Sequence, residues 1–289
     1  MLKRNVTAAV LIAVGLFFIL YLRTIFVELT DILFFAFTAV GAVEMCLVGK
    51  QAGYRAMILP IALYLAAFYP LFYFFGGTGV LAAAMISVVA ALAVFILRRQ
   101  VFSITDLEYT LLVLFYPLLL CSSFFLVNHS AGNLLGIFYI LFVTFLSDAF
   151  ALFAGILFGK KKLIEDVSPK KTVAGAVGAY VGGVLGATAV FLLFDVFRLF
   201  DGVNNAGLLA LTDKLWLSYI IYFFLALFST TLAIIGDLAA SWLKRKMNVK
   251  DFGKIFPGHG GVMDRLDSLL FVAPFVCLFF MIYNGVVGV

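Results

Sequence analysis

The sequence is poor in charged residues and in the side chains that most often bind zinc or form disulfides. Only 12% of its 289 residues are charged, while 65% are hydrophobic. A soluble domain is about a quarter charged, so this composition excludes an ordinary soluble fold. Three isolated cysteines (Cys46, Cys121 and Cys277) and two histidines occur without a CxxC or HExxH pattern, which argues against disulfide, redox and zinc chemistry. The composition predicts an integral membrane protein.

The common phosphate-binding loops are absent as well. Neither GxxxxGK[ST] nor GxGxxG occurs in the chain, which excludes the loops that hold phosphates in P-loop and dinucleotide-binding domains. The net charge of +5 suits an anionic membrane surface or an anionic ligand, but it identifies neither. Any phosphate chemistry in this protein must therefore use another arrangement of cations, glycines and carboxylates.

Long apolar runs, in contrast, are abundant. A transmembrane helix needs about 20 mostly apolar residues. The runs predict an all-α integral membrane protein with about nine transmembrane helices, in an N-terminal bundle (1–132, spans 1–5) and a C-terminal bundle (133–289, spans 6–9). The pair Gly76-Gly77 predicts the turn between the third and fourth spans. The expected spans are 6–22, 25–48, 56–75, 78–97, 108–127, 134–158, 173–194, 215–236 and 268–287.

The basic residues predict the orientation of these spans. With a cytoplasmic N-terminus and nine spans, 17 of the 20 lysines and arginines fall on the cytoplasmic side, as the positive-inside rule requires. The C-terminus then lies outside, and a polar stretch at 237–267 lies in the cytoplasm. In a bacterium the protein would lie in the inner membrane. No internal repeat is visible, which counts modestly against a secondary transporter.

Few polar residues interrupt the spans. Asp148 lies ten residues before Phe158, where its run ends, and is thus about 15 Å deep at 1.5 Å per residue. A carboxylate at that depth is costly, so Asp148 is a functional candidate, with a structural ion pair as the alternative. Glu44 lies near the inner mouth of the second span, where we expect it to snorkel or to be hydrated. Glycines repeat every four residues from 178 to 186, which predicts close helix packing.

The polar stretch 237–267 concentrates cations and carboxylates between two apolar runs. Ionisable groups gathered in this way in a membrane protein either lie in water or take part in chemistry. We expect the eighth helix to continue as far as Met247. Asp237, Ser241 and Lys244 would then lie on one face of that helix.

Two more carboxylates close the stretch. Asp264 and Asp267 are three residues apart, so we expect them to share a face where the ninth helix begins. Mg²⁺ prefers oxygen ligands and is commonly held by one or two carboxylates together with substrate phosphates. The pair therefore predicts a magnesium site. Arg265 points elsewhere and could clamp a phosphate or act as a counter-ion.

Two loops carry features that suit an anion. The turn Pro257-Gly258-His259-Gly260-Gly261 can bring backbone N–H groups close to a phosphate, because glycine has no Cβ. His259 could donate to a phosphate, or it could be a structural hydrogen-bonder. The loop Ser168-Pro169-Lys170-Lys171-Thr172 enters a helix, so Ser or Thr can cap it and two lysines lie near its N-terminus. The alternative for this loop is a basic segment at the membrane surface.

The order of these residues resembles the signature of the phosphatidate cytidylyltransferases, or CDP-diacylglycerol synthases. The resemblance covers about 145–270. It departs from the family at Ala174, where an acidic residue is usual, and at Ile156, where arginine is frequent. The positions that carry it are Asp148, Gly155, Gly159, Lys160, the 168–172 loop, Gly175, Ser241, Lys244, Arg245, Lys250, Asp251, Gly253, the 257–261 turn, Asp264, Arg265 and Asp267.

The resemblance implies that CTP and phosphatidic acid react in the lipid bilayer to give CDP-diacylglycerol and pyrophosphate, with the C-terminal bundle catalytic. It implies Mg²⁺ on Asp264, Asp267 and Asp237, with Lys244 and Asp148 also catalytic. A homodimer is possible and no nucleic-acid partner is expected. The residues expected to bind substrate are Ser241, Arg245, Lys250, Asp251, His259, Gly260, Gly261, Arg265, Ser168, Lys170, Lys171 and Thr172.

Two alternatives remain open at this point. A CTP-dependent lipid kinase, or a related nucleotidyltransferase acting on another lipid phosphate, would share much of this apparatus, but the kinase would release CDP rather than pyrophosphate. A polytopic transporter without chemistry would move a substrate and leave CTP intact.

Overall fold

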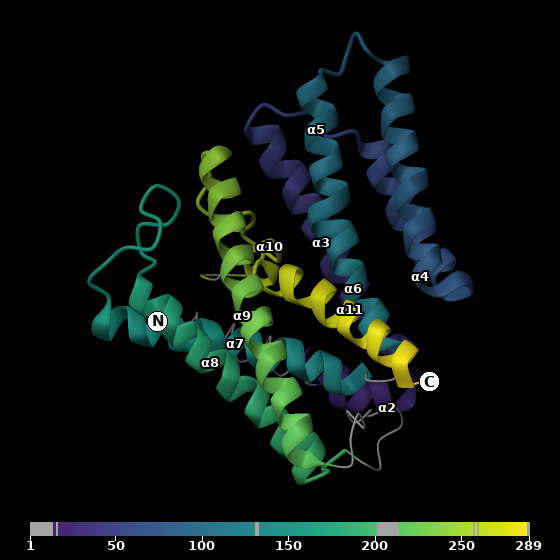
Figure 1. The fold of residues 1–289 in the computed structure, drawn as a ribbon. Coiled ribbons are helices and arrows are strands. Elements are labelled where there is room, and N and C mark those ends of the chain that lie inside the picture. The colour runs from purple at the N-terminus through teal and green to yellow at the C-terminus, as the bar shows by residue number, and fades with distance from the viewer. Residues whose placement is uncertain are drawn as a thin grey trace. The chain divides into compact units, whose positions relative to one another are not determined.

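Every regular element that the structure describes is a helix (Figure 1). The computed structural model describes residues 14–15, 17–130, 133–200, 214–256, 258 and 260–287. Within these ranges, extended pairing is limited to two isolated bridges, Lys162 with Thr172 and Phe256 with Gly260. Helices satisfy their own backbone hydrogen bonds, which is what a chain in lipid requires. The prediction of an all-α fold is confirmed.

The chain folds into two compact units, and neither is a single stretch of sequence. The first unit contains the described residues of Met1–Leu16, Asp31–Leu126 and Lys244–Leu266, and the second contains those of Phe17–Thr30, Val127–Leu243 and Asp267–Val289. The polar stretch 237–267 therefore contributes its middle to the first unit and both its ends to the second. The predicted division into 1–132 and 133–289 stays a prediction.

The first unit is built mainly from the helices of the N-terminal half. The capping box at Ser103 starts one of them: the Ser103 side chain accepts from the Asp106 N–H, and the Asp106 carboxylate accepts from the Ser103 N–H at 2.8 Å. Pro117 has no N–H to donate, and the helix widens to a π-turn around it. The elements are α3 (Glu28–Gln51, its first three residues in the second unit), α4 (Ile58–Leu97), α5 (Ile104–Val113), η2 (Leu114–Leu119), α6 (Leu120–Asn128, its last two residues in the second unit) and α10 (Met263–Leu266).

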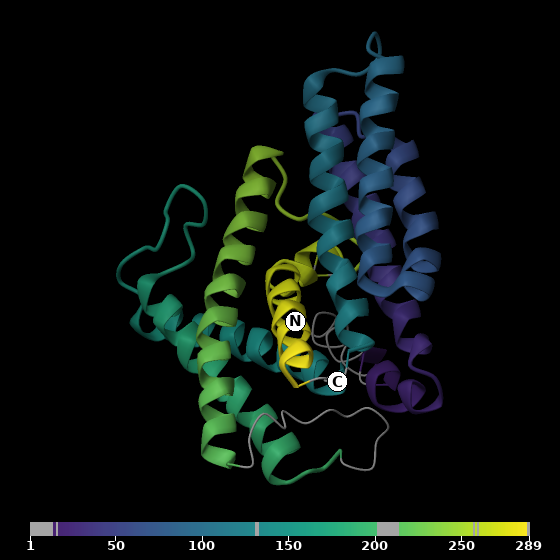
Figure 2. The ribbon, with the colours of Figure 1, turned by 45° about the vertical axis from the view of Figure 1, so that its right-hand side comes forward.

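Helix α4 reverses direction in its middle, as the Gly76-Gly77 pair predicted. Gly76 has φ 56° and ψ −133°, a conformation that is not helical and that favours glycine. A Cβ on Gly79 would overlap the carbonyl of Leu71, although residues eight apart in a straight helix are about 12 Å apart. The 40 residues of α4 thus form two antiparallel segments, which can be followed in Figure 2.

The second unit contains the helices of the C-terminal half and a short N-terminal segment. Its α9 ends at Lys246, so the prediction that this helix continues to about Met247 is confirmed. The elements are η1 (Phe17–Leu22), α2 (Arg23–Ile25), α7 (Asn133–Phe158), α8 (Val173–Phe191), η3 (Leu192–Val196), α9 (Leu215–Lys246, its last three residues in the first unit) and α11 (Leu269–Val287).

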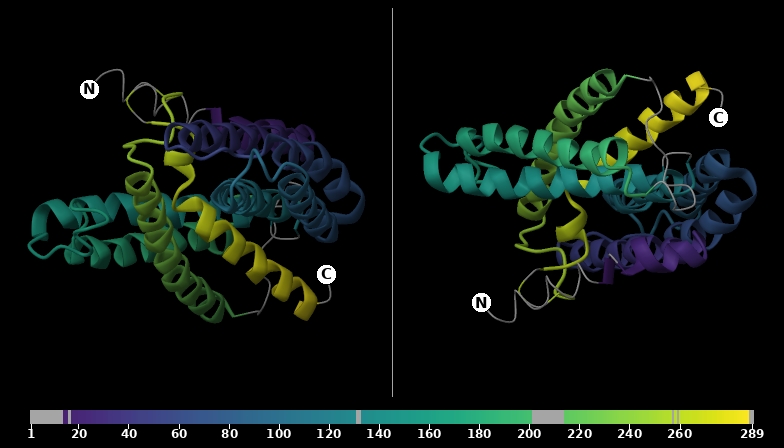
Figure 3. Two further views of the ribbon diagram at one scale, coloured as in Figure 1. Left: turned by 90° about the horizontal axis from the view of Figure 1, so that it is seen from above. Right: turned by 90° about the horizontal axis from the view of Figure 1, so that it is seen from below.

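Glycines bring α8 against the backbone of α7, and the two helices lie side by side in both views of Figure 3. A Cβ on Gly178 or Gly186 would lie 2.6 Å from a carbonyl oxygen of α7. A Cβ on Gly182 would overlap the carbonyl of Leu146. Small residues allow this approach, and in a membrane such packing replaces the hydrophobic effect as the force between helices. The predicted close packing is confirmed.

Several helices are long and apolar enough to cross a bilayer. Within the described residues there are six such stretches: Glu28–Gln51, Ile58–Leu97, Ile104–Asn128, Asn133–Phe158, Val173–Val196 and Leu215–Lys246. Leu269–Ile282 is a shorter apolar helix. These stretches support a multi-pass membrane protein. The predicted first span, 6–22, lies mostly outside the described residues, so the count of nine spans and the orientation of the termini stay predictions.

Candidate functional site

A buried ion pair joins the end of α9 to the predicted metal carboxylate of the first unit. Lys244 Nζ lies 2.9 Å from Asp264 Oδ1, and the two side chains are 16% and 4% exposed. The same ammonium lies 5.3 Å from the centre of the Phe252 ring, where the electron-rich face of the ring adds attraction. Lys244 stands in the last turn of its helix, an end at which a cation is favoured. Lys244 is thus largely buried and is held by Asp264 and the Phe252 ring.

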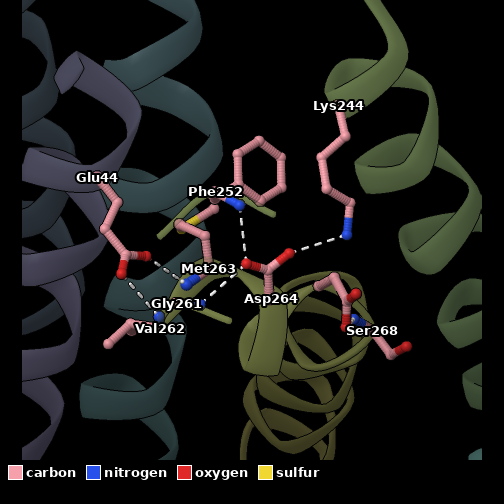
Figure 4. A network of polar contacts seen from close by, with 9 residues as sticks. Glu44, Lys244, Phe252, Gly261, Val262, Met263, Asp264 and Ser268 are labelled. Carbon is pink, nitrogen blue, oxygen red and sulfur yellow. Dashed lines mark hydrogen bonds and ion pairs between the residues drawn. The ribbon is translucent and has the colours of Figure 1, made fainter. Parts of the chain in front are cut away.

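Asp264 also holds the backbone of the polar stretch (Figure 4). Its Oδ2 accepts from the N–H groups of Phe252, at 2.8 Å, and Gly261, at 3.0 Å. An ionised carboxylate offers about four lone-pair positions, so three are used and one on Oδ1 is left. Gly260 permits the approach, since its φ is +80° and a Cβ there would lie 2.7 Å from Oδ2. Asp264 thus ties together three segments of the first unit.

Glu44 of α3 is part of this network, although the sequence analysis placed it in water. It is 3% exposed, and its two oxygens accept from the N–H groups of Val262, at 3.0 Å, and Met263, at 2.9 Å. A Cβ on Gly253 or on Gly261 would overlap Oε1. The expectation that Glu44 is hydrated is wrong, because the start of α10 supplies the hydrogen bonds that water would give. Two signature glycines thus leave room for a distant carboxylate.

The glycine turn of the signature is shaped by two residues at positive φ. Gly258 and Gly260 both have φ +80°, and the Phe256 N–H donates to the Gly260 carbonyl at 2.9 Å. The N–H of Gly261 faces Asp264, so that donor is already engaged. His259 and Pro257 lie outside the described residues. Phosphate contacts at this turn stay predictions.

A second ion pair, which is partly exposed, lies in the second unit. Lys171 Nζ is 2.7 Å from Asp237 Oδ2, with side chains 22% and 35% exposed. The pair links the loop that precedes α8 to α9. Thr172, the next residue, caps α8: its Oγ1 accepts from the Gly175 N–H at 3.0 Å. The predicted helix cap is confirmed at Thr172.

The loop that carries Lys171 is held at both ends. Leu163 N–H donates to the Lys171 carbonyl and Val173 N–H donates to the Lys161 carbonyl, each at 3.0 Å. A Cβ on Gly159 would lie 2.9 Å from Thr172 Oγ1, so that signature glycine makes room for the cap. The loop is a short, tied hairpin rather than an open strand of basic residues.

The backbone of Asp267 lies against α9 at the residue before Asp237. A Cβ on Gly236, the residue before Asp237, would lie 2.6 Å from the Asp267 carbonyl oxygen. Asp267 Oδ1 accepts from the Ser268 N–H at 2.9 Å. The second unit therefore brings two of the three predicted metal ligands onto neighbouring backbone segments. Among the described residues, however, there is no group of three or more His, Cys, Asp or Glu side chains arranged to hold a metal.

The remaining predicted site residues lie on the same elements or on their loops. Ser241 is half-buried on α9, between Asp237 and Lys244 along the helix. Asp148 is exposed on α7, ten residues before its end at Phe158. Ser168 is half-buried and lies three residues before Lys171 in the loop that precedes α8. The other exposed residues of the predicted site are Lys170, Arg245, Lys250, Asp251 and Arg265.

A family model matches nearly the whole chain, and curated relatives match about half of it or more. The sequence model described as "Cytidylyltransferase family" matches residues 2–283. A phosphatidate cytidylyltransferase of Bacillus subtilis is 32% identical over 203 residues, which are 70% of this chain and 68% of the relative. One of Thermotoga maritima is 35% identical over 168 residues, or 57% and 56%. One of Staphylococcus saprophyticus is 41% identical over 142 residues, or 48% and 47%. These alignments span from about half to two thirds of the relatives' lengths.

Proposed function

The chain belongs to the cytidylyltransferase family, and from this premise we propose that it transfers the CMP moiety of CTP to phosphatidic acid. The products are CDP-diacylglycerol, for phospholipid synthesis, and pyrophosphate. The proposal is carried by the agreement between family membership and the structure of the signature. There, Asp264 accepts hydrogen bonds from Lys244 and from the Gly261 N–H. A multi-pass helical protein suits a reaction between a lipid and a water-soluble nucleotide.

The reaction needs charge neutralisation more than it needs a base. An oxygen of the lipid phosphate attacks the α-phosphorus of CTP and forms a new P–O–P bond. The bond from the α-phosphorus to the oxygen that bridges it to the β-phosphorus breaks, and pyrophosphate leaves with that electron pair. The nucleophile is already an anion, so fixed cations supply most of the help by offsetting the charge that gathers on the leaving group.

We assign one role to the lysines that are anchored by a carboxylate and another to the exposed cations. Lys244 and Lys171 are the fixed ones, because each is anchored by a carboxylate. Mobile, exposed cations would contact the outer phosphates of CTP or the lipid headgroup, and the turn 258–261 would approach the nucleotide with His259. The exposed and loop residues assigned to substrate binding are Lys170, Arg245, Lys250, Arg265, Asp251, Ser168, Thr172, Ser241, Gly260 and Gly261.

We further propose that Mg²⁺ is held by Asp264 and Asp267 and shared with Asp237. The donor set fits, because Mg²⁺ takes carboxylate oxygens and completes its shell with water and substrate phosphates. Asp237 keeps one oxygen beyond the one that faces Lys171, and Asp264 keeps one lone-pair position on Oδ1. When bound, the ion would neutralise the phosphates of the nucleotide. Asp148 would place the lipid headgroup or complete this site.

We propose that the site faces the cytoplasm, where CTP is available, and that a bacterial cell would carry the protein in its inner membrane. The distribution of lysine and arginine over nine spans supports this orientation. A homodimer is compatible with the glycine-lined helices but is not required by the reaction. Cysteine labelling of single loop positions in sealed vesicles would test the orientation.

Purified protein with CTP, phosphatidic acid and Mg²⁺ is expected to form a CDP-lipid and pyrophosphate in equal amounts. Release of CDP with a phosphorylated lipid would instead identify a CTP-dependent lipid kinase. Absence of nucleotide turnover in folded protein, with flux of a solute across vesicles, would identify a transporter. Labelled CTP resolved by thin-layer chromatography, with a coupled pyrophosphate assay, separates the three outcomes.

Lys171→Met is expected to lower turnover at least about tenfold while the melting temperature changes little. A partly exposed ion pair contributes about 0–1 kcal/mol to stability, whereas loss of a fixed cation beside a reacting phosphate removes transition-state stabilisation. Lys162→Met, at an exposed lysine of the same loop, is the matched control and should keep wild-type turnover. Equal rates for both variants would remove Lys171 from the site.

A further inference from the structure

One buried carboxylate of the first unit has no place in the chemistry proposed so far. Glu44 reaches from α3 to the backbone of the signature, 218 residues further along the chain. It is as buried as the apolar core around it, at 3% exposure. A charged group is kept in such a position only when it is well hydrogen-bonded, and both of its oxygens are.

Glu44 and Asp264 divide one short run of backbone between them. The N–H groups of Gly261, Val262 and Met263 are consecutive, and the first donates to Asp264 while the next two donate to Glu44 (Figure 4). The backbone immediately before Asp264 is therefore fixed from two sides. Movement of Glu44 would turn these peptides and carry the Asp264 carboxylate away from Lys244.

We infer that Glu44 is a positioning residue for the cytidylyl transfer: it holds 261–263 so that the Lys244–Asp264 pair keeps its working geometry. The inference rests on the proposed function for its kinetic part. Its structural part rests only on four hydrogen bonds: those of Glu44 with Val262 and Met263, and those of Asp264 with Gly261 and Lys244. A catalytic constellation displaced by about 1 Å can lose about 10²-fold in rate, so a residue that touches no substrate can still set turnover.

Glutamate is required here for its two acceptors and for its reach. Glutamine has almost the same shape, but it replaces one acceptor with an NH₂ group that would face a backbone N–H. Aspartate keeps both acceptors on a side chain one methylene shorter. A residue that only filled space would be replaced by glutamine without loss, so Glu44→Gln separates positioning from packing.

Glu44→Gln is expected to lower kcat about tenfold with the KM for phosphatidic acid unchanged. Amide hydrogen exchange is expected to rise in the peptide that covers 252–264 and to stay at wild-type levels in α7 and α8. Glu108→Gln is the matched control, because Glu108 is exposed on α5 in the same unit. It should leave kcat and exchange unchanged.

A double-mutant cycle with Gly261 tests the contact itself. The three atoms nearest to a Cβ on Gly261 all belong to Glu44, so Gly261→Ala should be severe in the wild type. In a Glu44→Ala background that Cβ has room, so the added loss from Gly261→Ala should be smaller. Effects on two groups in direct contact are not additive, whereas those on independent sites are.

Wild-type kcat and wild-type loop exchange in Glu44→Gln would overturn the inference, as would additive effects in the cycle. Raised loop exchange with a wild-type kcat would also overturn it, because the loop would then be held without consequence for the reaction. If wild-type protein makes no CDP-lipid, the proposed function fails on its own. The exchange data and the cycle, read by melting temperature, would still decide whether Glu44 fixes 261–263.

Discussion

Asp264→Ala is expected to reduce turnover by at least about 10²-fold, which is the loss seen when a principal transition-state stabiliser is removed. The change deletes the partner of Lys244 and leaves the N–H groups of Phe252 and Gly261 without acceptors. Each buried donor left unpaired costs about 1–3 kcal/mol. Initial rates of CDP-lipid formation and the melting temperature in detergent measure the two effects separately.

Asp264→Asn separates charge from architecture. Asparagine keeps a carbonyl oxygen that can accept from the two backbone N–H groups, but it cannot neutralise Lys244 or hold a divalent ion as a carboxylate does. We expect turnover as low as in Asp264→Ala with most of the stability regained. Asp166→Ala, at an exposed loop aspartate, controls for the loss of one negative charge. Near-normal turnover in both Asp264 variants would contradict the assigned role.

Local features of the fold could be predicted where the cause lies within a few residues. Apolar runs of sufficient length form helices. The chain turns at Gly76 because glycine can adopt the positive φ that the turn requires. Thr172 caps α8, as a threonine before a helix favours. The four-residue glycine spacing predicted contact along α8, since such residues share one helix face. In each case the sequence itself contains both partners or the complete pattern.

Features that depend on distant partners could not be predicted. The predicted site contains several lysines and five aspartates, and nothing in their spacing assigns Lys171 to Asp237 or Lys244 to Asp264. Glu44 was misjudged for the same reason: its partners are backbone N–H groups, which every residue but proline offers. The only available signal was indirect: Gly253 lies outside the glycine turn, and the structure shows that a Cβ there would overlap Glu44.

The two ion pairs have the same composition, a lysine and an aspartate of the predicted site. Each joins a lysine expected to meet phosphate with a carboxylate expected to hold Mg²⁺, and each lies within a single unit. Each pair therefore balances one lysine against one aspartate within its own unit. The loss of one member should therefore be felt first within its own unit, which hydrogen exchange of the other unit can check.

Gly182→Ala is expected to be strongly destabilising, although it lies outside the polar network. The new Cβ would overlap the Leu146 carbonyl, and it would also lie 2.8 Å from the Phe150 Cβ. The obstacle is backbone of α7, which cannot rotate away as a flexible side chain can. Overpacking usually costs about 1–3 kcal/mol, and we expect the upper end or more, seen as a lower melting temperature.

Gly77→Ala is the matched control for this prediction. It is the same substitution, and the nearest atom to its Cβ is a Leu126 methyl at an ordinary 3.7 Å. A general intolerance of alanine in place of glycine in these helices would lower the melting temperature equally in both variants.

Separation of α7 from α8 should also loosen Thr172, which packs against Gly155 and Gly159. Gly182→Ala should therefore raise exchange in the Lys171 loop and lower turnover, whereas stable protein with a normal loop would show that α8 does not need the close approach.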